Sequence, residues 1–144
     1  MNAEEYRDHG PRPYVLDIER ATLANDTFRT ALWTGRQLQL TVMSIDPGGE
    51  IGLEVHPDRD QFLRVEAGRG RVVMGPEKDR LDFDEEVRAD WVALVPAGSW
   101  HNVLNTGDEP LKLYSLYAPP EHPHGTVHPT KAEADAAEEA EEEA

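Results

Sequence analysis

Short apolar runs separated by turn-forming residues are the feature that most restricts how this chain can fold. Between residues 14 and 118, β-branched and aliphatic runs alternate with Gly, Pro, Asp and Asn. This spacing is typical of an all-β sandwich or barrel, and no long amphipathic helix pattern interrupts it. The expected strands are residues 27–33, 36–45, 51–56, 61–66, 69–74, 91–95, 100–105 and 111–118. Residues 82–88 are too acidic to assign.

The length of the chain allows one domain. A chain of 144 residues can bury roughly 68–70% of the surface that its unfolded form exposes, which is enough for one core. We expect an N-terminal arm at residues 1–13, a barrel at 14–120, and a His/Pro-rich segment with an acidic tail at 121–144. The first part of that last region should lie extended on the barrel. The Ala/Glu-rich remainder should be a frayed helix or disordered.

The charge of the chain restricts its partners. The formal net charge is −15, of which residues 131–144 contribute −6 and the rest −9. Such a field repels phosphate backbones and anionic lipids, so neither nucleic acid nor membrane is expected as a partner. The sequence has no long apolar run and no charged-then-apolar leader, which predicts a cytoplasmic protein. It also has no cysteine, so a metal would need nitrogen and oxygen ligands.

Four side chains are candidates for such ligands. In a strand, Glu54 and His56 would point to the same face, since they are two residues apart. Gln61 opens the next expected strand, and antiparallel pairing could return it beside His56. His101 follows a Pro-Ala-Gly turn. Two imidazoles, a carboxylate and an amide oxygen suit Zn, Mn, Fe or Ni better than Ca or Mg. Spacing alone leaves open that these are ordinary hydrogen-bonded side chains.

The region around the first three candidates has a recognisable pattern. Gly48 and Gly68 enclose it, with Glu54, His56 and Gln61 between them. It resembles the first motif of the cupin family, in which a glycine precedes His-x-His, a glutamate and a second glycine. His56 matches the second histidine. Glu54 stands where the first histidine is usual, and Gln61 where the glutamate is usual.

A second motif strengthens the resemblance. Residues 96–105 match the cupin pattern Pro-x-Gly-x-x-His-x-x-x-Asn at every specified position, although Asp90 replaces the glycine that often precedes it. Together the two motifs cover roughly residues 38–118. The resemblance implies a single cupin-type double-stranded β-helix, or jelly-roll, barrel. It also implies one divalent metal ion (Zn, Mn, Fe or Ni) held by Glu54, His56, Gln61 and His101.

The ligand set resembles two kinds of enzyme site. Two His, one Glu and one Gln resemble the zinc site of phosphomannose isomerases, which favours sugar-phosphate isomerase-like chemistry on a small polar metabolite. Two His and one carboxylate also resemble non-haem Fe(II) oxygenases, which makes dioxygenase-like oxidation an alternative. A third possibility is a non-catalytic cupin that binds a small ligand or is purely structural, because the fold alone does not define a function.

The sequence does not identify catalytic or substrate-binding residues. His122, His124 and Tyr117 are candidates for a base only if the C-terminal segment folds over the barrel mouth. Arginines near the first motif could bind a carboxylate or phosphate if they face inward, but surface positions are expected for most of them. These arginines are Arg59, Arg64, Arg69 and Arg71.

We also expect a homodimer formed through barrel strands. Cupins commonly associate in this way. The segment that contains Tyr14, Val15, Leu16 and Ile18 carries apolar side chains that one small barrel would leave uncovered.

Overall fold

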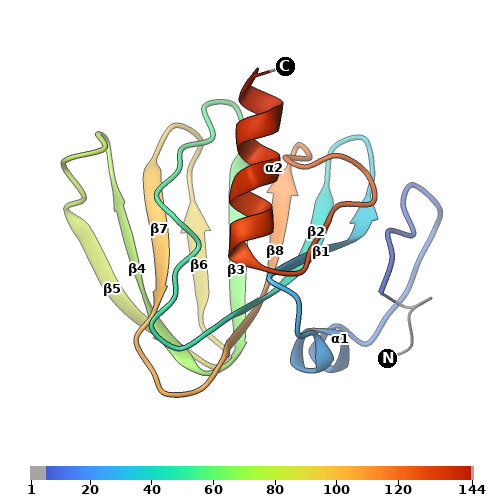
Figure 1. The fold of residues 1–144 in the computed structure, drawn as a ribbon, viewed down its shortest axis with the longest axis horizontal. Coiled ribbons are helices and arrows are strands. Elements are labelled where there is room, and N and C mark those ends of the chain that lie inside the picture. The colour runs from blue at the N-terminus through green and yellow to red at the C-terminus, as the bar shows by residue number, and fades with distance from the viewer. Residues whose placement is uncertain (1–5, 144) are drawn as a thin grey trace.

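The computed structural model describes residues 6–143, which form a two-sheet β-barrel with a helix at each end of the chain (Figure 1). The larger sheet contains, in spatial order, β6 (Val92–Val95), β3 (Asp60–Ala67), β8 (Leu111–Ala118), β2 (Gln39–Ile45), β1 (Arg29–Thr34) and β9 (Val127–His128). The smaller sheet contains β5 (Phe83–Arg88), β4 (Arg69–Gly75) and β7 (Trp100–Asn105). The helices are α1 (Ile18–Ala24) and α2 (Lys131–Glu143).

The order of the strands confirms the all-β jelly-roll barrel. Every pairing between these strands is antiparallel, and β8 lies between β2 and β3, which it follows late in the chain. In the other sheet, β4 pairs with β7 as well as with its neighbour β5. The acidic residues 82–88 include β5, an edge strand whose side chains are exposed except for Val87. Charged side chains on an edge strand discourage pairing with other chains.

The barrel interior has an apolar half and a polar half. Along β8, Leu111 and Leu113 face inward and belong to the main hydrophobic core. The next inward residues on that strand are Ser115 and Tyr117. β3 changes from apolar to polar inward residues at the same level of the barrel, because its polar residue Gln61 pairs with Tyr117 of β8. The apolar half supplies the hydrophobic stabilisation, and the polar half can therefore be used for a site.

A second hydrophobic cluster lies on the outer side of the larger sheet. Leu32, Leu40 and Val42 are buried there against Ala21 of α1, and Leu16 and Ile18 pack on them. Asp17 caps α1 by accepting a hydrogen bond from the backbone N–H of Arg20, at 3.1 Å. The sequence pattern did not indicate this short helix. Leu16 and Ile18, two of the four apolar residues from which we predicted a homodimer, thus cover the chain's own barrel.

The segment between β2 and β3 does not form the strand expected at residues 51–56. It makes isolated bridges to β7 instead, from Glu50 to Leu104 and from Glu54 to His101. Gly52 has φ = 114°, which side-chain-bearing residues rarely adopt, and this breaks the regular ladder. The expected pairing of this segment with residues 61–66 was wrong, because β3 pairs with β6 and β8.

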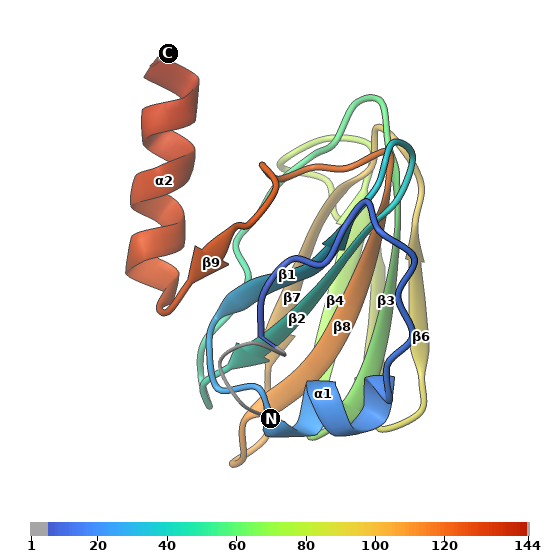
Figure 2. The same ribbon diagram turned by 90° about the vertical axis from the view of Figure 1, so that its right-hand side faces the viewer.

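The C-terminal region runs along the barrel and ends in α2. The side-chain amide of Gln39 anchors it, accepting from the backbone N–H of His122 and donating to the carbonyl of the same residue, each at 2.9 Å. β9 then pairs with β1. Of the two states expected for the acidic tail, the structure has the helix, and Ala134 buries its methyl group in the main core. Figure 2 shows α2 standing beside the barrel beyond β9.

Neither helix of the described residues has the length and apolar composition to cross a membrane. The cytoplasmic location and the domain boundaries remain predictions.

The homodimer also remains a prediction, and we expect it to use an exposed apolar surface beside the sheet edges. Phe83 and Leu94 are 50% and 67% exposed and line one apolar groove of about 510 Å³ beside the edge strands β5 and β6. Exposed apolar grooves at sheet edges are typical of association surfaces. We expect Leu94→Lys to convert a dimer into a monomer, measured by light scattering at micromolar concentration. Leu38→Lys, at a residue 40% exposed between β1 and β2 and outside this groove, is the control and should remain dimeric. A wild-type monomer would contradict the prediction.

Candidate metal centre

Backbone pairing between two distant segments positions the site. Glu54 and His101 exchange two backbone hydrogen bonds, of 3.0 and 2.9 Å. The side-chain oxygen of Asn102 accepts a further bond from the N–H of Gly52 at 2.9 Å, which fixes the unusual backbone there. His56 follows two residues after Glu54. The irregular segment thus presents its carboxylate and imidazole toward the imidazole of β7.

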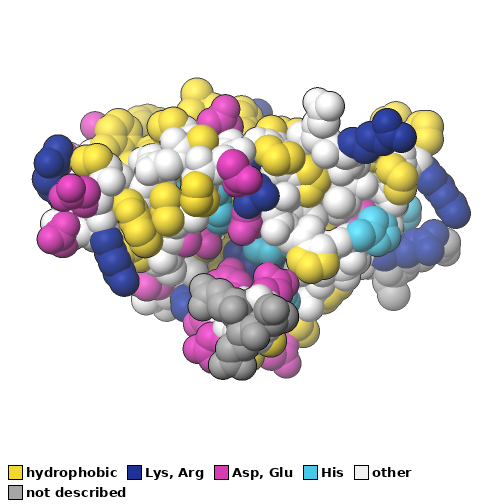
Figure 3. All heavy atoms as spheres, turned by 90° about the horizontal axis from the view of Figure 1, so that it is seen from above, with side chains coloured by type: hydrophobic (Ala, Val, Ile, Leu, Met, Phe, Trp, Pro, Cys, Tyr) yellow, Lys and Arg dark blue, Asp and Glu magenta, His cyan; other side chains and the backbone are white. Residues whose placement is uncertain are grey.

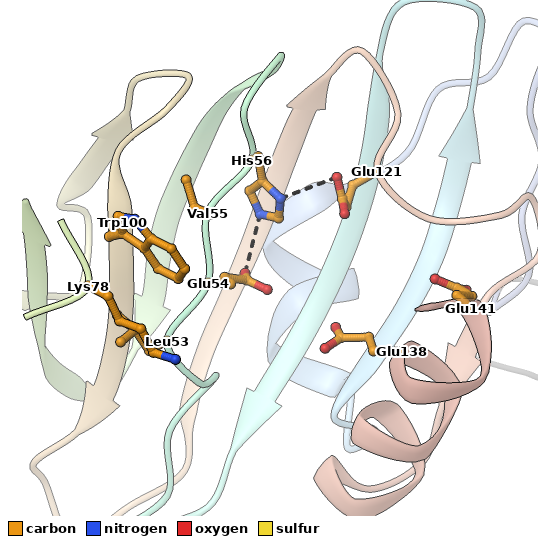
Figure 4. Close-up of a pocket in the computed structure, with 9 residues that line it drawn as sticks. All are labelled: Leu53, Glu54, Val55, His56, Lys78, Trp100, Glu121, Glu138 and Glu141. Atoms are coloured by element: carbon orange, nitrogen blue, oxygen red, sulfur yellow. Dashed lines mark ion pairs between the residues drawn. The ribbon is translucent and has the colours of Figure 1, made fainter. Parts of the chain in front are cut away.

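The three side chains converge closely. Glu54 Oε1 lies 3.4 Å from His56 Nε2 and 3.6 Å from His101 Nε2. Donor atoms from all three residues lie within 4.8 Å of one another, and the two imidazole centroids are 5.2 Å apart. Figure 4 shows His56 between Glu54 and Glu121. The arrangement is a Glu/His/His cluster that could hold a metal ion.

Both imidazoles are oriented by hydrogen bonds at their far nitrogens. His101 Nδ1 lies 2.9 Å from the carbonyl oxygen of Ser99, which can only accept a hydrogen bond. His56 Nδ1 lies 3.2 Å from a carboxylate oxygen of Glu121, which Arg59 contacts in turn. Protonated Nδ1 atoms leave the Nε2 lone pairs directed toward Glu54. Metal-binding histidines are commonly oriented by such outer partners.

The atoms directed at this point are not satisfied by the protein. Among the described residues, Nε2 of His56 and Nε2 of His101 have no hydrogen-bond partner. Their distances to Glu54 exceed the usual hydrogen-bond range of about 2.7–3.2 Å. Buried polar atoms without partners are costly, so their convergence fits a bound cation.

The electrostatics of the cluster agree with this geometry. Burial by itself lowers the pKa of His56, but the carboxylates of Glu121 and Glu54 outweigh it and raise that pKa to about 9. Burial tends to raise the pKa of Glu54, and the contacts with His101 and His56 outweigh this and hold it well below its usual range. The cluster therefore has a strong demand for positive charge, which a proton or a metal ion can meet.

Gln61 lies on the same inner face of the barrel. It is buried, and its amide nitrogen donates to Ser115 Oγ at 2.8 Å. Within the described part of the chain its amide oxygen has no partner. Its neighbour in the sheet is Tyr117, whose ring lies 5.8 Å from that of His56. A buried, unpaired amide oxygen on this inner face fits the predicted fourth ligand, whose role stays a prediction.

The other candidates from the sequence fall into different environments. Tyr117 and His122 are buried together inside the barrel, with ring centroids 5.3 Å apart. His124 is outside, 2.8 Å from the carbonyl oxygen of Gly10 and close to Asp8, so it joins the two terminal segments.

The four arginines singled out from the sequence lie in different environments. Arg59 supports Glu121, while Arg64 pairs with Glu66 and Asp90. Arg69 and Arg71 are exposed. The expectation of surface positions was thus correct for these last two. The inward arginine is Arg29 on β1, which is 1% exposed and which the sequence reasoning missed. The only available signal was its place within an otherwise apolar expected strand.

A pocket of about 500 Å³ opens beside the cluster. Glu54 and His56 form its inner part, and acidic side chains from the C-terminal region face them, including two from α2 (Figure 4). Figure 3 shows acidic and histidine side chains gathered around the centre of this face. The nine lining residues are Leu53, Glu54, Val55, His56, Lys78, Trp100, Glu121, Glu138 and Glu141.

Comparison with known proteins gives consistent results. The family described as Cupin domain matches residues 41–117. YrkC of Bacillus subtilis (strain 168) is 62% identical over 132 residues, which are 92% of this chain and 71% of YrkC. L612 of Acanthamoeba polyphaga mimivirus is 36% identical over 115 residues, 79% of this chain and 70% of L612. The crystal structure of BH2720 from Bacillus halodurans is 65% identical, with a TM-score of 0.90 over 90% of this chain and 98% of that one.

The geometry predicts that each histidine is essential for metal affinity. We expect His56→Ala and His101→Ala each to weaken zinc binding by more than about 100-fold, since outer partners of ligands alone contribute about 10–100-fold. Both variants should keep a β-type circular dichroism spectrum, because the apolar half of the barrel is untouched. Metal stoichiometry after dialysis measures the effect. His124→Ala, outside the cluster, is the control, and unchanged stoichiometry in either test variant would remove that histidine from the site.

Proposed function

The chain belongs to the cupin family, and on that premise we propose that it is a metal-dependent enzyme acting on a small polar metabolite. The convergence of Glu54, His56 and His101 beside the pocket carries the proposal. A barrel that served only as a structural unit would gain nothing from burying two imidazole nitrogens without partners. A divalent ion would satisfy both nitrogens and the carboxylate at once.

The donor set indicates the kind of metal. Two imidazole nitrogens, one carboxylate and the amide oxygen of Gln61 suit zinc, manganese, iron or nickel. When bound, such an ion supplies Lewis-acid chemistry, polarising an oxygen of the substrate. The protein's part is to fix the imidazole tautomers through Ser99 and Glu121 and to keep the apolar half of the barrel dry behind the site.

Two further interior groups are suited to hold substrate hydroxyls. Burial, the largest influence on Tyr117, raises its pKa to about 12, so its phenol stays protonated and can donate a hydrogen bond. Burial and then the charge of Arg29 lower the pKa of His122 to about 3, so its ring stays neutral. Among the residues described, Nε2 of His122 has no partner. A neutral imidazole of such low basicity is better suited to accept a hydrogen bond than to store a proton.

Within this proposal we prefer isomerase-like chemistry on a sugar phosphate or a similar polyhydroxy compound. The donor set with Gln61 and the polar half of the barrel support a substrate with several hydroxyl groups. Dioxygenase-like oxidation is the second candidate, and the cluster of two histidines and one carboxylate favours it. A cupin that binds a small ligand without catalysis is the third.

Metal content and isotope exchange would separate these candidates. We expect protein purified without chelator or histidine tag to hold about one zinc or manganese ion per chain, measured by elemental analysis. With such protein, aldose and ketose phosphates in D₂O should gain deuterium next to the carbonyl carbon, detected by NMR. Iron and oxygen consumption would instead support oxidation. Protein that holds no metal and takes up none would contradict the proposal.

Glu54 and Gln61, where the chain departs from the usual motif, give an asymmetric prediction. Glu54→Gln removes the negative charge of the cluster and should weaken zinc and manganese affinity about tenfold or more, since one charge-assisted contact is lost. Gln61→Glu adds a negative charge, so it should retain or tighten the metal while lowering activity, because the ion becomes a poorer Lewis acid.

Isothermal titration of both variants with Zn(II) and Mn(II) would measure the asymmetry. Glu50→Gln is the matched control, because it removes the same charge from the same segment outside the cluster. Affinities equal to wild type in both test variants would mean that neither side chain contacts the metal.

A further inference from the structure

Arg29 is a buried cation that the proposed metal chemistry does not use. It lies on β1 and is 1% exposed, among the most deeply buried large side chains described. Lysine and arginine are almost never fully buried unless they are paired. Its pairing therefore indicates what this part of the cavity is adapted to hold.

The partners of Arg29 leave its charge poorly compensated. Nη1 lies 3.2 Å from Nδ1 of His128. Burial and the charge of Arg29 lower the pKa of His128. An imidazole carries no negative charge, so His128 does not compensate the guanidinium. Among the described residues, its ion-pair partner is Glu138 of α2, whose Oε1 lies 3.9 Å from Nη1. Considering the described residues, Nε of Arg29 has no hydrogen-bond partner. The guanidinium thus has donor capacity left within the barrel.

Arg29 faces the same interior as the metal cluster. Its charge acts on Glu54, Tyr117 and His122, which surround the polar half of the barrel. Glu138, its carboxylate partner, lines the pocket together with Glu54 and His56 (Figure 4). A ligand in this pocket would therefore meet the metal cluster on one side and Glu138 on the other, with the buried Arg29 paired behind Glu138.

We propose that Arg29 binds an oxyanion of the substrate, a carboxylate or a phosphate, and that Glu138 occupies this position when no ligand is bound. The inference rests on the proposed function, because it places the anionic end of the same small molecule opposite the metal. It implies that the substrate is an anion and that Glu138 of α2 competes with it for Arg29.

The chemistry of the two partners supports an exchange. A guanidinium is a planar fork that binds carboxylates and phosphates through two parallel hydrogen bonds. Glu138 offers one long contact from a side chain that is 42% exposed, so the pair is weak. The helix is anchored one turn earlier by Ala134, which is 1% exposed. Beyond that anchor, Glu138 can leave while the beginning of α2 stays docked.

Anion titration of metal-stripped full-length protein tests the proposal. The probes are inorganic phosphate and malonate, titrated by calorimetry after passage over a chelating resin, and the tighter probe identifies the oxyanion. We expect Glu138→Gln to tighten binding about threefold, the size of a partly exposed ion pair. Glu139→Gln is the matched control, because it removes the same charge from the adjacent, exposed position of α2. Arg29→Gln should weaken binding at least about tenfold, the loss of a charge-assisted pair.

Each outcome bears on the proposal. Equal affinities in Glu138→Gln and Glu139→Gln would overturn the competitor role, and no binding of either probe to any folded form would overturn the oxyanion site. If Arg29→Gln does not fold, Arg29→Lys keeps the charge without the planar fork and should bind the probes more weakly than wild type.

A parallel zinc titration distinguishes failure of the oxyanion site from failure of the proposed metal-dependent function. Lost zinc binding with intact anion binding would reject the proposed function alone.

Discussion

The exchange of backbone hydrogen bonds between Glu54 and His101 is the interaction on which the candidate site depends. It fixes an irregular segment against β7, and the Glu54 carboxylate then meets both imidazoles within 3.6 Å. A regular strand would also present Glu54 and His56 to one face, but this segment makes only isolated bridges to β7 instead of a continuous ladder. Gly52, with its positive φ and its bond to Asn102, gives the segment the required path.

The division of the barrel into two halves makes this cluster energetically tolerable. Leu63, Val65, Leu111 and Leu113 belong to a core that needs no polar partner. In the other half, polar groups form chains such as Arg59–Glu121–His56, in which each group satisfies the next. Among the described residues, the buried atoms without partners around the site include Nε2 of His56, His101 and His122, the amide oxygen of Gln61, and Nε of Arg29 and Arg59. Several unpaired polar atoms around one interior space are typical of a binding site.

The sequence predicted the fold and the identity of the clustered donors because both depend on short-range patterns. The glycines and histidine of residues 48–68 and the turn before His101 are local features, and the structure brings Glu54, His56 and His101 together. The wrong pairing of residues 51–56 with β3 had a physical cause. A short connection favours a hairpin locally, but β3 gains more by pairing with β6 and β8 across a buried sheet.

Arg29 could not be recognised from sequence for a related reason. Its neighbours in the chain indicate only an ordinary strand. Its burial comes from β9 and α2, which are far away in sequence, and from Glu138, which belongs to a tail whose composition is equally compatible with disorder. Sequence periodicity indicates the structure of a single turn or strand. It does not indicate burial by a segment that is distant in the sequence.

The charges of the interior connect the metal and the anion. Glu54 and Arg29 are of opposite sign, and Glu121 is matched by Arg59. A divalent ion held by Glu54 would add two positive charges. Lys78 brings another positive charge to the pocket and Glu138 and Glu141 bring two negative ones, so one positive charge would remain in excess. Unbalanced charge in a poorly hydrated space is costly, and a ligand that brings its own negative charge reduces this cost. With the metal bound as proposed, the interior that demands a cation at Glu54 would favour an anionic molecule over a neutral one, although the protein as a whole carries a charge of −15. On the proposed oxyanion site, local charge balance inside the barrel, and not the net charge of the surface, would decide which small molecule fits.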